Sequence, residues 1–349
     1  MLQNATERED YKMGKPNSNV QELNIDVYAD GYSTLHTNCF DISLAGGTGL
    51  YRRSNYFDYL FLIAVNSNWA SDDAVLPTDF YQFRVPIFKR LGLNFSESTV
   101  RDSNDLVLQA TDRLANQCPC LVFLKYNACF YNEFYKEAPV NHTLLLSGFD
   151  NSKETITTRE FIHIRECIST LTRADMLCKL KLTYPIFQNM WELSNVQYAE
   201  TEPEYANKLY WLEADKQQPI NPINPISELI AALSRKRNTL EEIIENFNND
   251  RSRLQGMSMM ITRTAYYGAL EIIFESVERA ANIADNKEWA TIKREYSIHR
   301  DTLLSKLDMD NQRAKTYDHA EIQSLIGEVQ QWDKRLLTAL RECVGNYER

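Results

Sequence analysis

The sequence lacks any long hydrophobic run and any excess of basic residues. No stretch reaches the roughly 18 uninterrupted apolar residues that a transmembrane helix needs, which argues against a membrane-spanning protein. Lys and Arg number 38 against 48 Asp and Glu, and the net charge of -10 argues against a general nucleic-acid binder. The polar N-terminal stretch MLQNATERED has no basic-then-apolar signal-peptide pattern. We therefore expect a cytoplasmic protein with neither nucleic-acid nor membrane partners.

Cysteine and histidine are too scattered to suggest a disulfide framework or a metal site. The seven cysteines are odd in number and spread over a long chain, which favours free thiols in a reducing compartment. Cys118 and Cys120 are separated by one residue rather than by the two of a zinc knuckle, and no Cys/His cluster follows them. We expect both to be core residues at the start of a strand, and we predict no bound metal.

The sequence does have the composition of an ordinary globular protein, and its two halves show different residue patterns. Hydrophobic residues make up 44% and charged residues 25% of 349 positions, a length that suits about two domains. Residues 1–22 are polar and predict a loosely ordered lead, and residues 23–216 predict a mixed domain. The three prolines of QQPINPINPIS predict a linker at 217–226. Strongly amphipathic segments without internal prolines then predict an all-helical bundle at 227–349.

The first domain begins with helical patterns and continues with strand patterns. Residues 39–66 predict a helical block interrupted at Gly46-Gly47-Thr48-Gly49, and 105–117 has helical spacing. A continuous apolar run follows Pro119 and predicts a buried strand, as does 142–150. Residues 154–164 alternate as a third strand after a turn. The fold class predicted is therefore α+β, with a largely antiparallel strand set.

Two side chains in this domain form a candidate nucleophile and base. Cys39 opens a predicted helix, where the positive end of the helix dipole lowers the pKa of a thiol. His142 opens a buried strand 103 residues later, and papain-like enzymes place a histidine roughly 100 or more residues after a helix-starting cysteine. Two alternatives stay open: Cys39 is a buried inert thiol, or His36 is its local partner.

A family resemblance adds to this pattern. The stretch CPCLVFLKYNACFYNEFYKEAPVNHTLLLSGFDNSKETITT resembles the papain-like family of the butirosin biosynthesis protein H N-terminal domain. The resemblance covers about residues 28–165. The matching positions are a Pro-led apolar strand, an aromatic loop and a His-to-Gly-aromatic-Asp strand, namely Pro119, 121–124, Phe130, Tyr131, His142, Gly148, Phe149 and Asp150. The family usually has His-Cys-Gly at the cysteine, where this chain has Asn38-Cys39-Phe40.

The resemblance implies a papain-like fold and acyl transfer. The family's named member moves an aminoacyl group from a carrier-protein thioester to an aminoglycoside amine, in natural-product biosynthesis. Carried over to this chain, Cys39 would form the thioester and His142 would move the proton. Related domains have an Asp-Pro after the histidine strand, which this chain lacks. A hairpin turning at Asn151-Ser152 would pair His142 with about residue 161, so Glu160 is the nearest carboxylate to orient the imidazole. Its alternative is a solvated edge side chain.

Further roles follow for residues around this pair. The Cys39 backbone N–H is the expected oxyanion donor, and Asn38 and Ser33 are the candidate side-chain donors. Asn38 has the alternative role of a helix N-cap. The aromatic loop at 126–135, with Tyr126, Phe130 and Tyr131, would either line an acyl pocket or cover an edge of the core.

The expected partners are an acyl or peptidyl carrier protein and a small-molecule amine. No cofactor is expected beyond the phosphopantetheine that carries the substrate. Carrier proteins are acidic, so the basic stretches at 51–54, 89–90 and 234–238 are candidate docking points, or simply solvated faces. The helical half is a candidate surface for self-association. Two alternative functions stay open: a cysteine thioesterase or peptidase, in which water attacks the acyl-enzyme, and a catalytically inactive papain-like scaffold.

Overall fold

The fold of the sheet-containing part is organised around one long buried strand, β4 (Asn141–Asp150), in the computed structural model of the chain. The structure describes residues 19–25, 39–68, 80–132, 134–137, 139–161, 177–216, 222–234, 267–312 and 319–347. The other strands are β1 (Val20–Glu22), β2 (Leu93–Thr99), β3 (Cys120–Lys125), β5 (Thr155–Phe161), β6 (Leu177–Thr183) and β7 (Lys208–Ala214).

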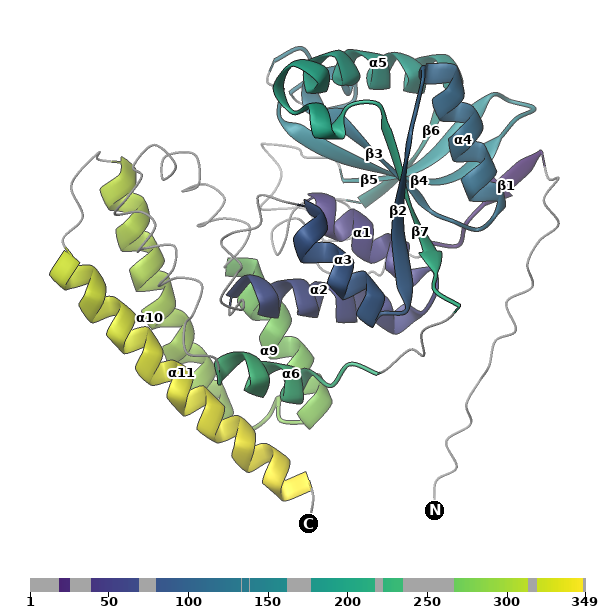
Figure 1. Cartoon of the computed structure of the whole chain (residues 1–349). Helices are drawn as coiled ribbons and strands as arrows, with labels where there is room; N and C mark the ends of the chain where they lie inside the picture. The colour runs from purple at the N-terminus through teal and green to yellow at the C-terminus, as the bar shows by residue number, and fades with distance from the viewer. Residues whose placement is uncertain are drawn as a thin grey trace, which may run out of the picture. The chain divides into compact units, whose positions relative to one another are not determined.

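These strands form one sheet, in which several neighbouring strands are not consecutive in the chain. In the described part of the chain the sheet has seven strands in the order β2-β7-β3-β4-β5-β6, and β1 pairs with β4 as well (Figure 1). The pairings of β4 with β1, β3 and β5, and of β3 with β7, are antiparallel. Together with the helices, this confirms the predicted α+β class and its antiparallel strand set.

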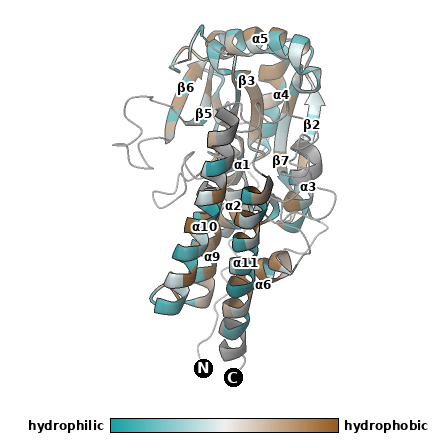
Figure 2. Ribbon diagram, turned by 90° about the vertical axis from the view of Figure 1, so that its left-hand side faces the viewer, coloured by the Kyte–Doolittle hydropathy of each residue, from teal (hydrophilic) through white to brown (hydrophobic). Residues whose placement is uncertain are grey.

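The two predicted apolar strands form the centre of the sheet. All side chains of β3 are buried, and in β4 only the two terminal residues are partly exposed. Because successive side chains of a strand point to opposite faces, both faces of β3 and β4 are shielded from water, as a continuous apolar run requires. The strands predicted within 119–131 and 142–150 are therefore confirmed. β3 is coloured as hydrophobic in Figure 2.

The β4–β5 hairpin differs from the predicted one. Its turn has four residues, Asn151 to Glu154, rather than two. The register also shifts between Leu146 and Gly148, where a bulge inserts Ser147. Beyond the bulge Leu145 pairs with Arg159, which is one residue away from the predicted register. A bulge of this kind leaves no reliable trace in the hydrophobic pattern.

Gly148 lies where the neighbouring strand β1 comes very close to β4. β1 pairs with residues 148–150 of β4, and β3 pairs with residues 141–146 on the same edge. A Cβ atom built on Gly148 would lie 2.6 Å from the Gln21 carbonyl oxygen and 3.0 Å from the Glu22 Cα atom. The glycine of the His-to-Gly-Phe-Asp motif therefore permits β1 to approach β4.

Two helices accompany the sheet, α4 (Ser103–Ala115) and α5 (Tyr184–Thr201), which lie side by side in Figure 1. The Asp102 side chain caps α4 by accepting from the Asp105 backbone N–H at 2.8 Å, which satisfies a donor left free at the helix start. Gln188 of α5 donates to Asn104 of α4 at 2.9 Å. α4 confirms the helix predicted at 105–117.

The remaining helices are α1 (Cys39–Gly49), α2 (Arg53–Asn68), α3 (Phe80–Arg90), α6 (Pro225–Leu233), α9 (Tyr267–Ala281), α10 (Lys287–Gln312) and α11 (His319–Tyr347). α10 and α11 are long and pack against each other (Figure 1). In α11, apolar side chains at helical spacing are buried, including Ile322, Val329 and Leu336. Both helices show hydrophilic and hydrophobic turns in Figure 2. The described residues of the C-terminal part thus form helices, as predicted.

The break between the first two helices falls later than predicted. α1 continues through Gly46 and Gly47 and ends at Gly49, and α2 begins at Arg53. The buried Thr48 hydroxyl lies within hydrogen-bond distance of two carbonyl oxygens, that of Ala45 at 2.8 Å and that of Asn55 at 3.1 Å, and its one proton can bond to either. Glycine lowers helix propensity without forbidding a helix, and here the burial of α1 outweighs that cost.

By packing, the described residues divide into two units. Unit 1 comprises Met1–Ile25, Phe95–Glu166 and Cys178–Glu213, and unit 2 comprises Asp26–Asn94, Cys167–Leu177 and Ala214–Arg349. The early helices belong to unit 2, since α2 packs against α6 and α9. The boundaries at 23–216, 217–226 and 227–349 stay a prediction, and the lead at 1–22 lies mostly outside the described residues. None of the described helices combines the length and apolar character that crossing a membrane would take.

Alanine at Gly148 should destabilise the sheet. The added Cβ would collide with backbone atoms of β1 rather than with a flexible side chain, so we expect a loss of about 1–3 kcal/mol in the free energy of unfolding. Gly327 in α11 is the matched control, because its Cβ position meets nothing within 4 Å and alanine favours a helix by up to about 1 kcal/mol. Urea unfolding of both variants measures the difference. Equal stabilities for G148A and G327A would contradict the close approach of β1.

Candidate functional site

The predicted site residues differ in how far the structure describes them. Cys39 is the first residue of α1 and belongs to unit 2, although its side chain lies outside the described residues. Asn38 and Ser33, the candidate oxyanion donors, lie outside the described residues altogether. Glu160 lies in β5, and its side chain is also outside the described part. The roles of these four residues stay predictions.

His142 is described in full and lies in unit 1. It is the second residue of β4 and pairs across the strand with Leu124 of β3. Its side chain is only 1% exposed, and its ring stacks on that of Tyr126 with a centroid distance of 4.2 Å and an interplanar angle of 22°. The register of β3 and β4 therefore holds an imidazole at the end of the sheet, shielded from bulk water.

The aromatic loop after β3 brings one of its three predicted pocket residues to the imidazole. Tyr126 is buried and contacts His142, as described above. Phe130 is 50% exposed, and its ring meets that of Tyr131 edge-on at 5.3 Å. The loop is fastened by two backbone bonds: the Tyr126 N–H donates to the Val140 carbonyl at 2.9 Å, and the Lys136 N–H donates to that of Asn127 at 3.0 Å.

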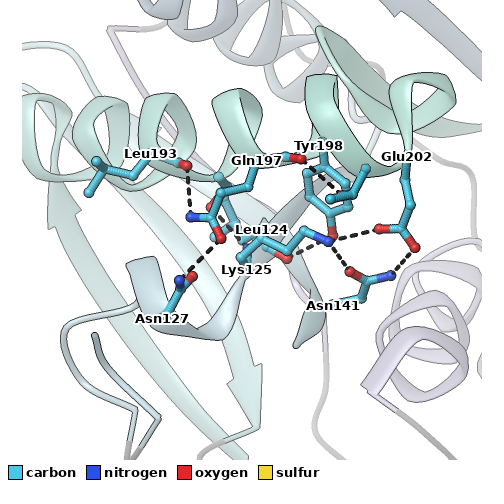
Figure 3. Close-up of polar contacts among 10 residues, drawn as sticks. Leu124, Lys125, Asn127, Asn141, Leu193, Gln197, Tyr198 and Glu202 are labelled. Atoms are coloured by element: carbon cyan, nitrogen blue, oxygen red, sulfur yellow. Dashed lines mark hydrogen bonds and ion pairs between the residues drawn. The ribbon is translucent and has the colours of Figure 1, made fainter. Parts of the chain in front are cut away.

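An ionic network that the sequence did not predict includes Asn141, the residue before His142 in β4 (Figure 3). Lys125, the last residue of β3, is buried, and its ammonium donates to the Glu202 carboxylate at 2.8 Å. The same ammonium donates to the Asn141 side-chain oxygen, and the Asn141 amide donates to the other Glu202 oxygen at 2.9 Å. The ammonium also lies 4.0 Å from the centre of the Tyr198 ring, an arrangement that favours a desolvated cation.

Helix α5 also bonds directly to the backbone of β3. The Lys125 N–H donates to the Ser194 hydroxyl oxygen at 2.9 Å, and the Tyr198 hydroxyl donates to the Leu124 carbonyl at 2.8 Å (Figure 3). The Asn127 amide donates to Gln197 at 3.1 Å. Every side chain in this set comes from α5 or from the first turn after β3, so α5 and the end of β3 form one hydrogen-bonded assembly.

The network and the imidazole lie on neighbouring residues of the same two strands. Lys125 pairs with Asn141, and Leu124 pairs with His142. Since successive residues of a strand alternate between faces, the Lys125–Asn141 pair and the His142 ring project to opposite faces. The network therefore fixes the backbone at this end of β4 from the face opposite the imidazole.

The sequence carried one signal for this network. Lys125 follows an apolar run directly, at a position where the pattern predicts burial, and a buried lysine almost always has a partner. Its partner Glu202 is 77 residues away along the chain, and no local pattern links the two.

The described cysteines of unit 1 are reduced thiols, and burial holds one of them in the protonated form. Cys118, Cys120, Cys129 and Cys178 are thiols rather than halves of disulfides. Burial raises the pKa of the Cys120 thiol well above its ordinary value, which keeps the sulfur protonated and unreactive. Among the described residues no group of three metal-binding side chains comes together.

Removing either end of the buried ion pair should destabilise the protein, but unequally. Glu202→Gln leaves the buried Lys125 ammonium without a countercharge, which costs about 3 kcal/mol for a buried pair. Lys125→Met leaves Glu202, whose side chain is 33% exposed and can be solvated, so we expect a smaller loss of about 1–2 kcal/mol. Urea unfolding gives both values, and the double variant should regain part of the loss. A larger loss in K125M than in E202Q would contradict this network.

Comparison with known proteins leaves the family open. No family model matches the chain, and no curated protein matches it. An assignment of function therefore rests on this chain's own residues, on their contacts, and on the motif resemblance around His142.

Proposed function

We propose that the protein is a cysteine-dependent acyl-transfer enzyme of papain-like fold, with Cys39 as nucleophile and His142 as general base and acid. The observation that carries the proposal is the setting of His142. An ionisable ring is buried near the end of the central strand, where it stacks on the ring of Tyr126. Buried titratable groups held in this way are candidates for catalysis.

The start of α1 at Cys39 supports the nucleophile role. The first backbone N–H groups of a helix have no partner within the helix, and the helix dipole favours negative charge there. Both effects favour a thiolate at this position over a neutral thiol. A free N–H at the helix start is also the donor that an oxyanion intermediate requires, with Asn38 or Ser33 as the proposed second donor.

The proposed reaction has two halves. The Cys39 thiolate attacks the carbonyl carbon of an acyl thioester, the carbon–sulfur bond of the substrate breaks, and the departing thiolate takes a proton from the His142 imidazolium to leave as a thiol. An amine then attacks the new thioester on Cys39 and gives its proton to the neutral imidazole, which releases an amide and restores the thiolate. Glu160 is the proposed orienter of the imidazole in both halves.

The substrate class follows from the family resemblance. The acyl group would be aminoacyl or peptidyl, carried on the phosphopantetheine of a carrier protein, and the acceptor would be a small-molecule amine or an amine of the same chain in a cyclisation. Such carriers work in the cytoplasm, so the proposal assigns the protein to that compartment and to natural-product biosynthesis.

The test is intact-mass analysis after incubation with an aminoacyl N-acetylcysteamine thioester. We expect a mass increase equal to the acyl group in the wild type, its loss in Cys39→Ala, and its discharge as an amide when an amine is added. His142→Gln should slow acylation by about 10²–10⁴-fold, the usual contribution of a general base.

Cys118→Ala is the matched control, since Cys118 is a partly exposed thiol outside the proposed site. This variant should acylate like the wild type. An adduct that persists in C39A, or that is lost in C118A, would show that another sulfur reacts. Discharge to the free acid in the presence of amine would establish a hydrolase instead. The absence of any adduct would favour the inactive scaffold.

A further inference from the structure

A buried ionic cluster holds the first turn of α1, the helix that begins at Cys39. Asp41, the third residue of α1, is only 2% exposed. Arg84 of α3 forms two bonds to its carboxylate, from Nε to Oδ1 at 2.8 Å and from Nη2 to Oδ2 at 3.0 Å. The Tyr59 hydroxyl of α2 donates to Oδ1 at 2.9 Å. One carboxylate thus ties the start of α1 to two other helices.

The cluster is rigidly packed and keeps its charges. Tyr59 is fully buried and its ring stacks on Phe88 with a centroid distance of 5.2 Å. Burial and the Asp41 charge raise the pKa of Tyr59 well above its ordinary value, so its hydroxyl stays a donor. Burial opposes the Arg84 charge, but Asp41 and Tyr59 outweigh it and raise the pKa of Arg84.

Stability alone gives little reason for this ion pair. Replacing a buried salt bridge by apolar side chains is often neutral or stabilising, because desolvating two charges is costly. The following residues of α1, including Ile42, Leu44 and Ala45, are buried and apolar or small, so burial of this turn does not by itself require a charged side chain. A directional bidentate contact does what apolar packing cannot, since it fixes the rotation and height of α1.

Position 39 lies on the other side of the helix from the cluster. With 3.6 residues per turn, two residues correspond to about 200° around the axis. When Asp41 is directed at α2 and α3, position 39 is on the side turned away from them. The cluster can therefore orient the first turn of α1 without occupying the side of the helix on which position 39 lies.

We propose that Asp41, Tyr59 and Arg84 form a positioning clamp for Cys39, which orients the start of α1 and cancels the buried carboxylate's charge within the turn that carries the thiol. This inference rests on the proposed function, in which Cys39 is the nucleophile. The clamp residues act through α1 and do not touch substrate. Arg84 is the balancing charge: without it, a buried anion would lie two residues from the thiol and disfavour the thiolate.

Two other ionisable groups on the same helices have contacts of their own. On α2, burial raises the pKa of Asp58, opposed by its bond to Ser54 and by nearby Arg52. On α3, Arg90 pairs with Glu228 at the surface. Tyr59 and Arg84 are thus the groups that α2 and α3 direct at the Asp41 carboxylate.

The clamp predicts that the loss of Arg84 and the loss of Asp41 shift the pH midpoint of Cys39 alkylation in opposite directions. The rate with iodoacetamide is measured against pH by peptide mapping of the Cys39 peptide, in variants whose fold is checked by circular dichroism. Arg84→Met should move the midpoint up by about one pH unit, because the anion loses its partner. Asp41→Asn should move the midpoint down by a similar amount, and the double variant should return it close to the wild type.

Arg90→Met is the matched control, since it removes the same charge from the same helix at an exposed pair and should leave the midpoint unchanged. Should R84M fail to fold, the isosteric D41N and the double variant still show in which direction the pH midpoint of Cys39 alkylation moves. Equal midpoints in all folded variants, or shifts of D41N and R84M in the same direction, would overturn the clamp.

The readout does not depend on acyl transfer. If the wild-type protein takes no acyl group from a thioester while these opposite shifts are observed, the proposed function fails and the clamp stands. If acylation occurs on Cys39 and the midpoint is insensitive to these variants, the clamp fails and the proposed function stands.

Discussion

The backbone pairing of β4 is the constraint on which the rest of unit 1 depends. A buried strand must satisfy its N–H and C=O groups along both edges, and β4 does so with three partners. β5 pairs along one edge, while β3 and β1 share the other, β3 beside residues 141–146 and β1 beside 148–150. This arrangement requires a glycine where β1 arrives, and it holds His142 at the opposite end of the strand, against Tyr126.

Charged side chains are buried at a few points of the described chain, and each fastens one element to another. Lys125 joins the end of β3 to α5 through Glu202, and Asp41 joins the start of α1 to α2 and α3. In the helical part, fully buried Arg300 donates to the Tyr296 hydroxyl at 3.0 Å, and that hydroxyl donates to Asp333 of α11 at 2.9 Å. Buried polar groups are costly unless satisfied, so they specify where elements lie more than they stabilise. Two of these points adjoin the residues to which we assign catalysis.

The sequence predicted the elements better than their connections. The apolar runs at positions 121–124 and 144–146 sufficed for β3 and β4, and amphipathic spacing sufficed for α4 and the C-terminal helices. The glycines before Leu50 suggested a break that burial of α1 overrides. The four-residue turn and the bulge at Ser147 together displace the hairpin by one residue from the predicted register. The partners of Lys125 and Asp41 could not be predicted, because they lie 77 and 43 residues away and depend on how whole helices pack.

We propose that the Cys39 thiol and the His142 imidazole act on one substrate, as nucleophile and as general base and acid. The most direct measurement is cross-linking with 1,3-dibromoacetone, which alkylates a thiol first and then bridges it to a nearby nucleophile through three carbons. We expect a bridge between Cys39 and His142, found by mass spectrometry of the digested protein. Alkylation of Cys39 without a bridge, or a bridge to another side chain, would contradict it.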